Sequence, residues 1–578
     1  MTPPLTRNST ATQNHTQNTR QIMLTLLAPY NDQVQILGTF TNWEPRDLQR
    51  DEQGWWRAEF PLADGDYEYR FRVKSKSWFA LDQWCEISDP YATRINPFNS
   101  DASILTIRNG ERVVDQYVWQ HDDKPLPSDS ELVLYEMHIG GFGWDPHQPE
   151  KFGTFDMVRA KLDYLVDLGV NAIELMPLHE FPMDYSWGYN PRFHFAVESA
   201  YGTPTDFKRL VDACHARGIR VILDVVFNHG ENEHPLTRID YDYWFYHDNP
   251  DPEGVRFGPK FDYVHFDEHR QTFPARDYVR ACALFWLREY HLDGFRFDAT
   301  ALINNFDFLR ELRDELKANS DGKPLLLIAE HLPPDPAVTG LHGPLDAAWH
   351  FAFHDQIKAN ILGKEVKGRQ PYDMDATLAA LDARRGGYSG TQNVVNFTTS
   401  HDESYAIAEL GAAGVFDQAA FRRAKNAATL LLTAPGIPML EMGEEFGEYS
   451  PTSIDDVKIH WELLDTPLAR DLHRYYKSLL LLRKTNRALQ QDNNIEFLYV
   501  NPERQVLAFK RWDEQGNVVV VVVNLHDTFA GEVEIPTLPA DGAWHEWLYD
   551  YDVTVQGGIL RDQLAESEIK IYLGPKSS

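Results

Sequence analysis

The sequence predicts an α/β protein built on a (β/α)8 TIM barrel, flanked by an N-terminal and a C-terminal β-sandwich. Short alternating runs broken by turns fill residues 21–110, and the same pattern returns over residues 491–578. Between them, over residues 111–490, short buried runs are each followed by a longer helical pattern. Regular short strands with turns are typical of a β-sandwich. Strand–helix pairs repeated over this length favour a closed barrel of parallel strands.

The chain begins with a polar segment and then enters the first β region. Residues 1–20 are rich in Thr, Asn and Gln and lack an apolar stretch, which predicts a disordered tail and argues against a secretory signal. Alternation then predicts strands at 34–40, 55–60 and 67–73.

In the central region, short strand-like runs alternate with segments of helical spacing. Strands are predicted at 132–136, 171–176, 220–227, 294–298, 325–330 and 394–398, and helices at 157–168, 207–217 and 278–290. A doubly wound sheet is the alternative, but no Gly-x-Gly-x-x-Gly loop follows the first strand. In the last region, strands are predicted at 497–500, 506–511, 518–524, near 532 and at 569–573.

Charge and composition exclude several classes of partner. Acidic side chains outnumber basic ones, 87 against 55, and the formal net charge is -32. Such a surface repels polyanions, so neither nucleic acid nor a membrane surface is expected as a partner. The longest valine run, 518–523, is far shorter than the roughly 20 residues of a membrane span. The three cysteines are odd in number and far apart, unlike a disulfide framework. We therefore expect a soluble, cytoplasmic protein.

Acidic residues stand at the ends of four predicted barrel strands, where the active sites of such barrels lie. These ends carry Asp224 with Asn228 and His229, Arg296 with Asp298, Glu330, and His401 with Asp402. One acid at a strand end is an ordinary cap. Four in succession, with two histidines and an arginine beside them, indicate a catalytic pocket.

Several acids in one pocket suit the cleavage of an acetal. One carboxylate attacks the anomeric carbon while a carboxylic acid protonates the leaving oxygen. Arg296 lies two residues before Asp298 on an extended segment, so both project to one face and the guanidinium keeps the carboxylate ionised. Asp298 is thus the predicted nucleophile. Glu330 follows an apolar run that would raise its pKa and suit a general acid/base.

The four strand ends, in this order, resemble the signature regions of the α-amylase family of glycoside hydrolases (family 13). Residues 38–43, Gly-Thr-Phe-Thr-Asn-Trp, resemble the family's N-terminal glycogen-binding module, and the last β region resembles its tail domain. The resemblance implies a retaining mechanism with Asp298 as nucleophile and Glu330 as acid/base, while Asp402 holds the hydroxyls of the distorted sugar. The substrate-binding residues that it implies are Arg296, His229, His401, Asp224, Tyr189 and Trp187.

Within the family, the sequence is most similar to glycogen branching enzymes and malto-oligosyltrehalose trehalohydrolases. Trp187-Gly188-Tyr189 and the segment 201–207 favour branching, that is, cleavage of α-1,4 links and formation of α-1,6 links in an α-glucan. The alternative is a hydrolase of α-amylase or trehalohydrolase type. Two departures from branching enzymes leave the choice open: His331 stands where a second acid is usual, and Ser404 where a valine is usual.

The remaining predictions concern ligands. No cofactor is expected. Calcium occurs in many family members, and Asn228 occupies a position that can be a ligand, but the six to eight oxygen ligands of a calcium site cannot be assembled from the sequence. The expected partner is an α-glucan, which Trp43, Trp55, Trp56 and Trp78 of the N-terminal module could stack against. One of Trp55 and Trp56 should instead be core, because adjacent strand residues face opposite ways.

Overall fold

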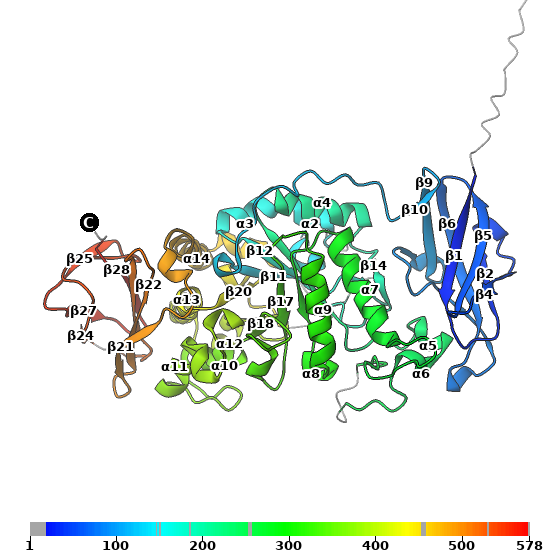
Figure 1. The fold of residues 1–578 in the computed structure, drawn as a ribbon. Helices are drawn as coiled ribbons and strands as arrows, with labels where there is room; N and C mark the ends of the chain where they lie inside the picture. Colours follow the sequence, from blue (N-terminus) through cyan, green and yellow to red (C-terminus); the bar gives the residue numbers. More distant parts are fainter. Residues whose placement is uncertain are drawn as a thin grey trace, which may run out of the picture. The chain divides into compact units, whose positions relative to one another are not determined.

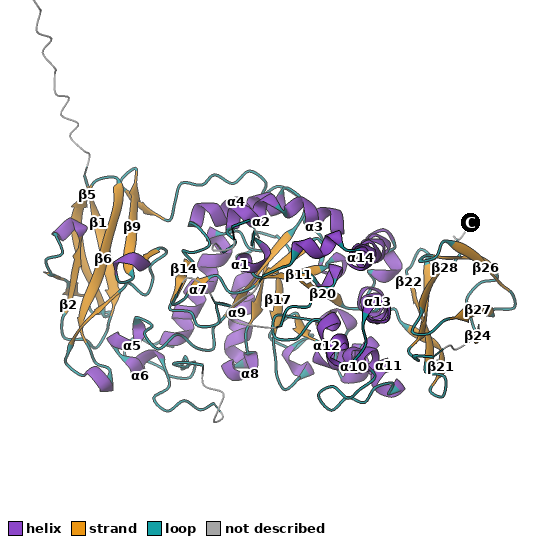
Figure 2. Cartoon of the chain, turned by 180° about the vertical axis from the view of Figure 1, so that it is seen from behind, coloured by secondary structure: helices purple, strands orange, loops and turns teal. Residues whose placement is uncertain are grey.

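The computed structural model describes residues 19–145, 147–148, 152–183, 186–251, 257–451, 458–528 and 531–575. It forms two compact units (Figures 1 and 2). The first contains the described residues up to Tyr117 together with Pro235–Tyr241, and the second contains the rest. The predicted disordered tail, except for residues 19 and 20, lies outside the described residues. Arg20 is already the first residue of a strand.

The first unit is a β-sandwich of two antiparallel sheets. One sheet has the order β1(Arg20–Leu27), β5(Trp55–Leu62), β4(Gln49–Arg50). The other contains β10(Glu111–Val113), β9(Ala102–Arg108), β6(Gly65–Lys74), β2(Val34–Gly38) and β3(Arg46–Asp47), with β7(Trp84–Ile87) on β6 and β8(Ile95–Asn96) on β9. The short helix α5(Leu236–Ile239) belongs to this unit, because Asn31 Nδ2 donates to Ile239 O at 2.9 Å and Ser77 Oγ to Thr237 O at 2.6 Å.

The second unit holds a closed barrel of eight parallel strands, which confirms the predicted fold class. In order, these are β11(Leu134–Met137), β12(Ala172–Leu175), β15(Arg220–Val225), β16(Gly294–Phe297), β17(Leu326–Ala329), β18(Ala347–Trp349), β19(Val394–Phe397) and β20(Ile437–Glu441). The hairpin β13(His179–Glu180), β14(Phe193–Val197) stands apart from the barrel.

Helices surround these strands (Figure 2). The longer ones are α3(Leu162–Leu168), α4(Pro204–His215), α7(Pro274–Glu289), α9(Phe306–Ala318), α10(Phe351–Leu362), α11(Met374–Leu381), α12(Ala406–Ala412), α13(Asp417–Thr433) and α14(Pro467–Thr485). The shorter ones are α1(Ile139–Phe142), α2(Phe155–Ala160), α6(Tyr241–Trp244) and α8(Thr300–Ile303). The sequence determines their starts locally. Helix α4 begins at Pro204 because Thr203 and Asp206 form a reciprocal capping box and proline suits the first turn.

The side chains inside the barrel change from apolar to acidic toward the carboxyl-terminal ends of the strands. Side chains on one face recur every second residue. On β15 and β17 the apolar core residues Ile222 and Ile328 are each followed, two positions later, by an acid, Asp224 or Glu330. Strands β11, β12 and β20 repeat this pattern with Leu134, Ala172 and Met439 followed by Glu136, Glu174 and Glu441. The apolar layers therefore hold the barrel together and leave a polar layer at its carboxyl-terminal edge.

A second antiparallel β domain follows the barrel. Its six-stranded sheet has the order β21(Glu496–Asn501), β22(Val506–Trp512), β23(Val518–Asn524), β28(Ile569–Leu573), β25(Gly542–Glu546), β26(Tyr551–Val555). The pair β24(Gly531–Ile535), β27(Leu560–Leu564) forms the second layer, and a common apolar core contains residues of both layers.

Candidate active site

The predicted site residues of the second unit meet at the carboxyl ends of the barrel strands. Asp224 lies on β15 and Arg296 on β16, and Asp298 directly follows β16. Glu330 follows β17, and the turn after β19 carries His401 and Asp402. Because parallel strands present these ends at one rim of the barrel, residues far apart in the sequence become neighbours.

The Arg296 guanidinium is the centre of the site and is fully buried. Its Nη1 contacts both Asp224 oxygens, at 2.8 and 2.9 Å, and Asp298 Oδ1 at 3.1 Å. Its Nη2 lies 3.0 Å from Glu330 Oε2. Asp298 and Glu330 therefore contact the two terminal nitrogens of one planar group, which fixes them close together with little rotational freedom.

The backbone after Asp298 contributes a further contact. Ala299 takes a left-handed conformation with φ 45°, which for a residue other than glycine costs about 1–2 kcal/mol. In this conformation its N–H donates to Glu330 Oε2 at 2.9 Å. Asn228 Nδ2 donates to Asp298 Oδ2 at 2.7 Å, so both predicted catalytic carboxylates are held by fixed donors.

Burial controls the protonation of two of these acids. Burial raises the pKa of Glu330, against the opposing effect of Arg296, and the Asp298 charge raises it further. Burial also raises the pKa of Asp224 to about 7, again against Arg296. A carboxyl group with a raised pKa retains a proton that it can give to a leaving group at a pH where an exposed acid has lost it.

His401 and Asp402 form a second pair of opposite charges. His401 Nε2 lies 3.2 Å from Asp402 Oδ2, and its Nδ1 lies 2.6 Å from Glu136 Oε1. Burial disfavours the charged imidazole, but Glu136 and Asp402 together raise the pKa of His401 well above its usual value. Burial would likewise raise the pKa of Asp402, but the His401 charge overcomes it and holds this pKa at about 2.

Aromatic rings line the same pocket. The Tyr189 ring stacks on His401 with 5.0 Å between centroids, and Trp187 meets His401 edge-on at 5.4 Å. The Tyr189 hydroxyl donates to Asp224 Oδ2 at 2.5 Å, and its carbonyl oxygen lies 3.0 Å from His229 Nε2. Burial lowers the pKa of His229 to about 4, so its ring is neutral. All nine predicted site residues thus belong to one connected cluster.

Sequence reasoning missed two members of this cluster. Trp349 at the end of β18 covers the Arg296 guanidinium, 4.5 Å from ring centroid to Cζ. Glu136 on β11 binds His401. Glu136 ends the predicted strand 132–136, so the strand-end pattern that indicated the other acids was present for it, whereas β18, which carries Trp349, was not predicted as a strand.

The Asn228 side chain, considered above as a calcium ligand, is engaged in contacts within the site. The Asn228 amide nitrogen is used on Asp298, and its oxygen contacts the His229 ring. Among the described residues no group of three or more His, Cys, Asp or Glu side chains is arranged to hold a metal ion.

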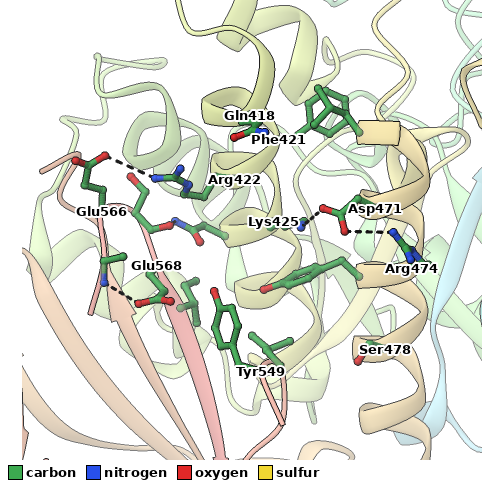
Figure 3. Close-up of a pocket in the computed structure, with 17 residues that line it drawn as sticks. Gln418, Phe421, Arg422, Lys425, Asp471, Arg474, Ser478, Tyr549, Glu566 and Glu568 are labelled. Atoms are coloured by element: carbon green, nitrogen blue, oxygen red, sulfur yellow. Dashed lines mark hydrogen bonds and ion pairs between the residues drawn. The ribbon is translucent and has the colours of Figure 1, made fainter. Parts of the chain in front are cut away.

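A separate cavity of about 630 Å³ lies between α13, α14 and the C-terminal β domain (Figure 3). It contains none of the predicted site residues. Two ion pairs lie in its lining: Lys425 with Asp471 at 2.6 Å, which joins α13 to α14, and Arg422 with Glu566 at 3.6 Å, which joins α13 to the C-terminal β domain.

In the N-terminal unit the predicted aromatic residues divide into core and surface. Trp56 is buried and its Nε1 donates to Ala28 O at 2.9 Å, whereas Trp55 is half-buried. Trp43 lies under the Arg70 guanidinium, 5.5 Å away. Trp78 is 60% exposed and meets Phe79 edge-on.

Comparison with known proteins assigns each part of the chain to a family. Residues 141–267 and 267–463 match the alpha amylase catalytic domain, residues 11–92 match carbohydrate-binding module 48 (isoamylase N-terminal domain), and residues 499–577 match the alpha amylase C-terminal all-beta domain. The chain belongs to the alpha-amylase family, which confirms the resemblance and the class of enzyme expected from the sequence.

Two kinds of relative stand out among similar curated proteins. The chain is 28% identical over 545 residues to the 1,4-alpha-glucan branching enzyme GlgB of Methylococcus capsulatus, covering 87% of this chain and 70% of that protein. It is 32% identical over 451 residues to the malto-oligosyltrehalose trehalohydrolase of Arthrobacter ramosus, covering 70% of each chain.

Solved structures support the fold. A pullulanase from Anoxybacillus sp. LM18-11, complexed with maltotriose, has a TM-score of 0.79 at 19% identity, covering 96% of this chain and 84% of that one. A type I pullulanase from Bacillus subtilis has a TM-score of 0.77 at 22% identity, covering 95% and 83%. No helix in the described part of the chain is long and apolar enough to cross a membrane.

Proposed function

We propose that the protein is a retaining enzyme that cleaves α-1,4 links of an α-glucan and rejoins the fragment through α-1,6 links. The observation that carries the proposal is the Arg296 centre, where Asp298 and Glu330 contact the two terminal nitrogens of one guanidinium. Retaining glycosidases need two carboxyl groups at one glycosidic bond, because one attacks the carbon that the other helps to free.

The residues divide the reaction between them. The Asp298 carboxylate attacks the anomeric carbon, and Glu330 gives its proton to the leaving glycosidic oxygen. The deprotonated Glu330 then takes a proton from the incoming hydroxyl, which displaces Asp298. Asp402 holds two hydroxyls of the distorted sugar, and Tyr189 stacks beneath its ring. Asp224, His229, His401 and Trp187 complete this subsite.

Branching is favoured because the match to a branching enzyme extends over 87% of this chain. The α-glucan as partner is supported by the match to a carbohydrate-binding module. Action in the reducing cytoplasm is supported by three cysteines that form no disulfide, Cys85, Cys214 and Cys282.

Trehalohydrolase action is the second candidate. The relative with the higher identity carries that name, and His331 stands beside Glu330 where branching enzymes usually place an acid. The His331 ring bonds Thr300 through Nδ1 at 2.9 Å, so it lies against the short helix α8 that follows the Asp298 loop.

Incubation with amylose tests the proposal. We expect new α-1,6 anomeric protons in the NMR spectrum with few new reducing ends. Reducing ends without an α-1,6 signal would contradict branching, and trehalose-capped malto-oligosaccharides would then be the substrate to measure.

A further inference from the structure

Three glutamates lie side by side in the polar layer of the barrel. Glu136 on β11 is in register with Glu174 on β12 and with Glu441 on β20. All three are at most 4% exposed. Three carboxylates cannot all be charged this close together in a dry interior, so the layer must distribute its protons unequally.

Glu136 carries the negative charge of this layer. Its Oε1 lies 2.6 Å from His401 Nδ1, and its Oε2 accepts from the His401 backbone N–H at 3.0 Å. Burial would raise the pKa of Glu136, but His401 lowers it. Burial, reinforced by the Glu136 charge, raises the pKa values of Glu174 and Glu441 well above the usual range.

Both ring nitrogens of His401 face carboxylates. One ring nitrogen meets the Glu136 carboxylate, and the other lies 3.2 Å from Asp402 Oδ2. A neutral imidazole has one N–H, so it can donate to only one of two acceptors. Both contacts are made together when the ring is an imidazolium.

We propose that Glu136 is a positioning residue that holds His401 doubly protonated, so that the Nε2–H of His401 fixes Asp402 in the glucan subsite. The assignment rests on the proposed function for the role of Asp402. Glu136 itself touches no reacting atom, because His401 lies between it and the pocket.

Other charged groups also act on this ring. Titratable groups that interact with His401 are His138 at the start of α1, Glu174 on β12, Asp224 on β15 and Asp402 beside it. Arg296 on β16 and Glu441 on β20 act on Glu136. In the described part of the chain, Glu136 and Asp402 are the carboxylates within ion-pair distance of the His401 ring nitrogens.

The test compares Glu136→Gln with Glu174→Gln. Both replace a buried carboxyl in the same layer by an amide of the same shape, but only the first removes the charge that faces His401. We expect kcat/KM of the Glu136→Gln enzyme to fall at least tenfold at pH 8 and to recover as the pH is lowered through about 6.5, the ordinary pKa of histidine. The Glu174→Gln enzyme should keep the pH profile of the parent.

A direct measurement on the parent protein needs no activity. In the parent protein labelled with ¹³C-histidine, the His401 ring signal, assigned by its loss in His401→Asn, should keep the shift of an imidazolium from pH 6 to 8. A ring that titrates near 6.5 in the parent would overturn the proposal, and so would equal effects of the two glutamine substitutions. Because no glucan is present, this result is independent of whether the enzyme branches or hydrolyses.

Discussion

At the scale of single residues, one buried cation faces three carboxyl groups. Asp224, Asp298 and Glu330 all contact Arg296. Full ionisation of all three would leave two excess negative charges away from water, which is costly. The burial that raises the pKa values of Asp224 and Glu330 therefore favours protonated acids beside Asp298, the proposed nucleophile.

The choice of substrate can distinguish the roles proposed for the two carboxyl groups, Glu330 and Asp298. We expect Glu330→Gln and Asp298→Asn each to lower kcat on malto-oligosaccharides by about 10²–10⁴ or more. An α-glycosyl fluoride releases fluoride, which needs no proton, so Glu330→Gln should retain the first step on this substrate while Asp298→Asn should not. Fluoride release by both variants, or by neither, would contradict the assignment.

The pH dependence follows from the raised pKa of Glu330. The acid must be protonated to act, so activity on malto-oligosaccharides should persist above the usual titration range of a glutamic acid and fall as the pH rises through the Glu330 pKa. Asp402, with a pKa of about 2, stays ionised throughout. In pH–rate profiles, the loss of activity at high pH should be absent when Glu330→Gln releases fluoride. If the loss of activity persists in this variant, a group other than Glu330 causes it.

At the scale of elements, periodicity predicted most of the barrel. Six of its strands were expected within a few residues of their observed ends, and the two that were missed, β18 and β20, are short or contain a proline. The single helix expected at 157–168 is observed as two helices, α2 and α3, because the helix is interrupted at Lys161. In the C-terminal domain β25, β26 and β27 were not predicted.

The limits of prediction in the site have a physical cause. Asp298 and Arg296 are two residues apart, so the alternation of one strand predicts their contact. Glu136 and His401 are 265 positions apart, and their hydrogen bond exists only because closing the barrel brings β11 near the turn after β19. Local pattern carries no information about such a pair.

Strand β16 carries Arg296 and is followed directly by Asp298, and Gly294 determines how closely the strand approaches β17. A Cβ at Gly294 would lie 2.3 Å from the Leu326 carbonyl oxygen. Gly294→Ala should therefore displace the strand, lower the free energy of unfolding by about 1–3 kcal/mol and reduce activity. Urea titration measures the stability. Gly386→Ala, where a Cβ meets nothing within 4 Å, is the control and should match the parent; equal losses in both would contradict the argument.

At the scale of the whole molecule, we propose that the barrel supplies the chemistry and that the N-terminal module offers a surface for polymer. Trp78→Ala should weaken binding to glycogen by about 1 kcal/mol, because a large exposed ring is lost, and leave kcat on short malto-oligosaccharides unchanged. Affinity electrophoresis in glycogen gels measures this. Phe98→Ala, at a 92% exposed ring elsewhere in the module, is the control. An unchanged mobility of Trp78→Ala would exclude a role for this tryptophan.

Whether the enzyme transfers or hydrolyses is also a property of the whole molecule. Water and a sugar hydroxyl compete for the same glycosyl-enzyme, and a barrier difference of about 1.4 kcal/mol changes the outcome tenfold. The proposed catalytic carboxyl groups would be common to both reactions, so their sequence predicts the chemistry. The ratio of transfer to hydrolysis depends instead on the loops that bind the acceptor.

The most direct test of the account is to trap the covalent intermediate. A 5-fluoro α-glycosyl fluoride loses fluoride to the nucleophile and leaves an ester that breaks down slowly. We predict that the intact protein gains the mass of one 5-fluoroglycosyl group and that the labelled peptide carries it on Asp298. A label on Glu330 or Asp402, or no label on a protein that turns over α-glucan, would contradict the central claim.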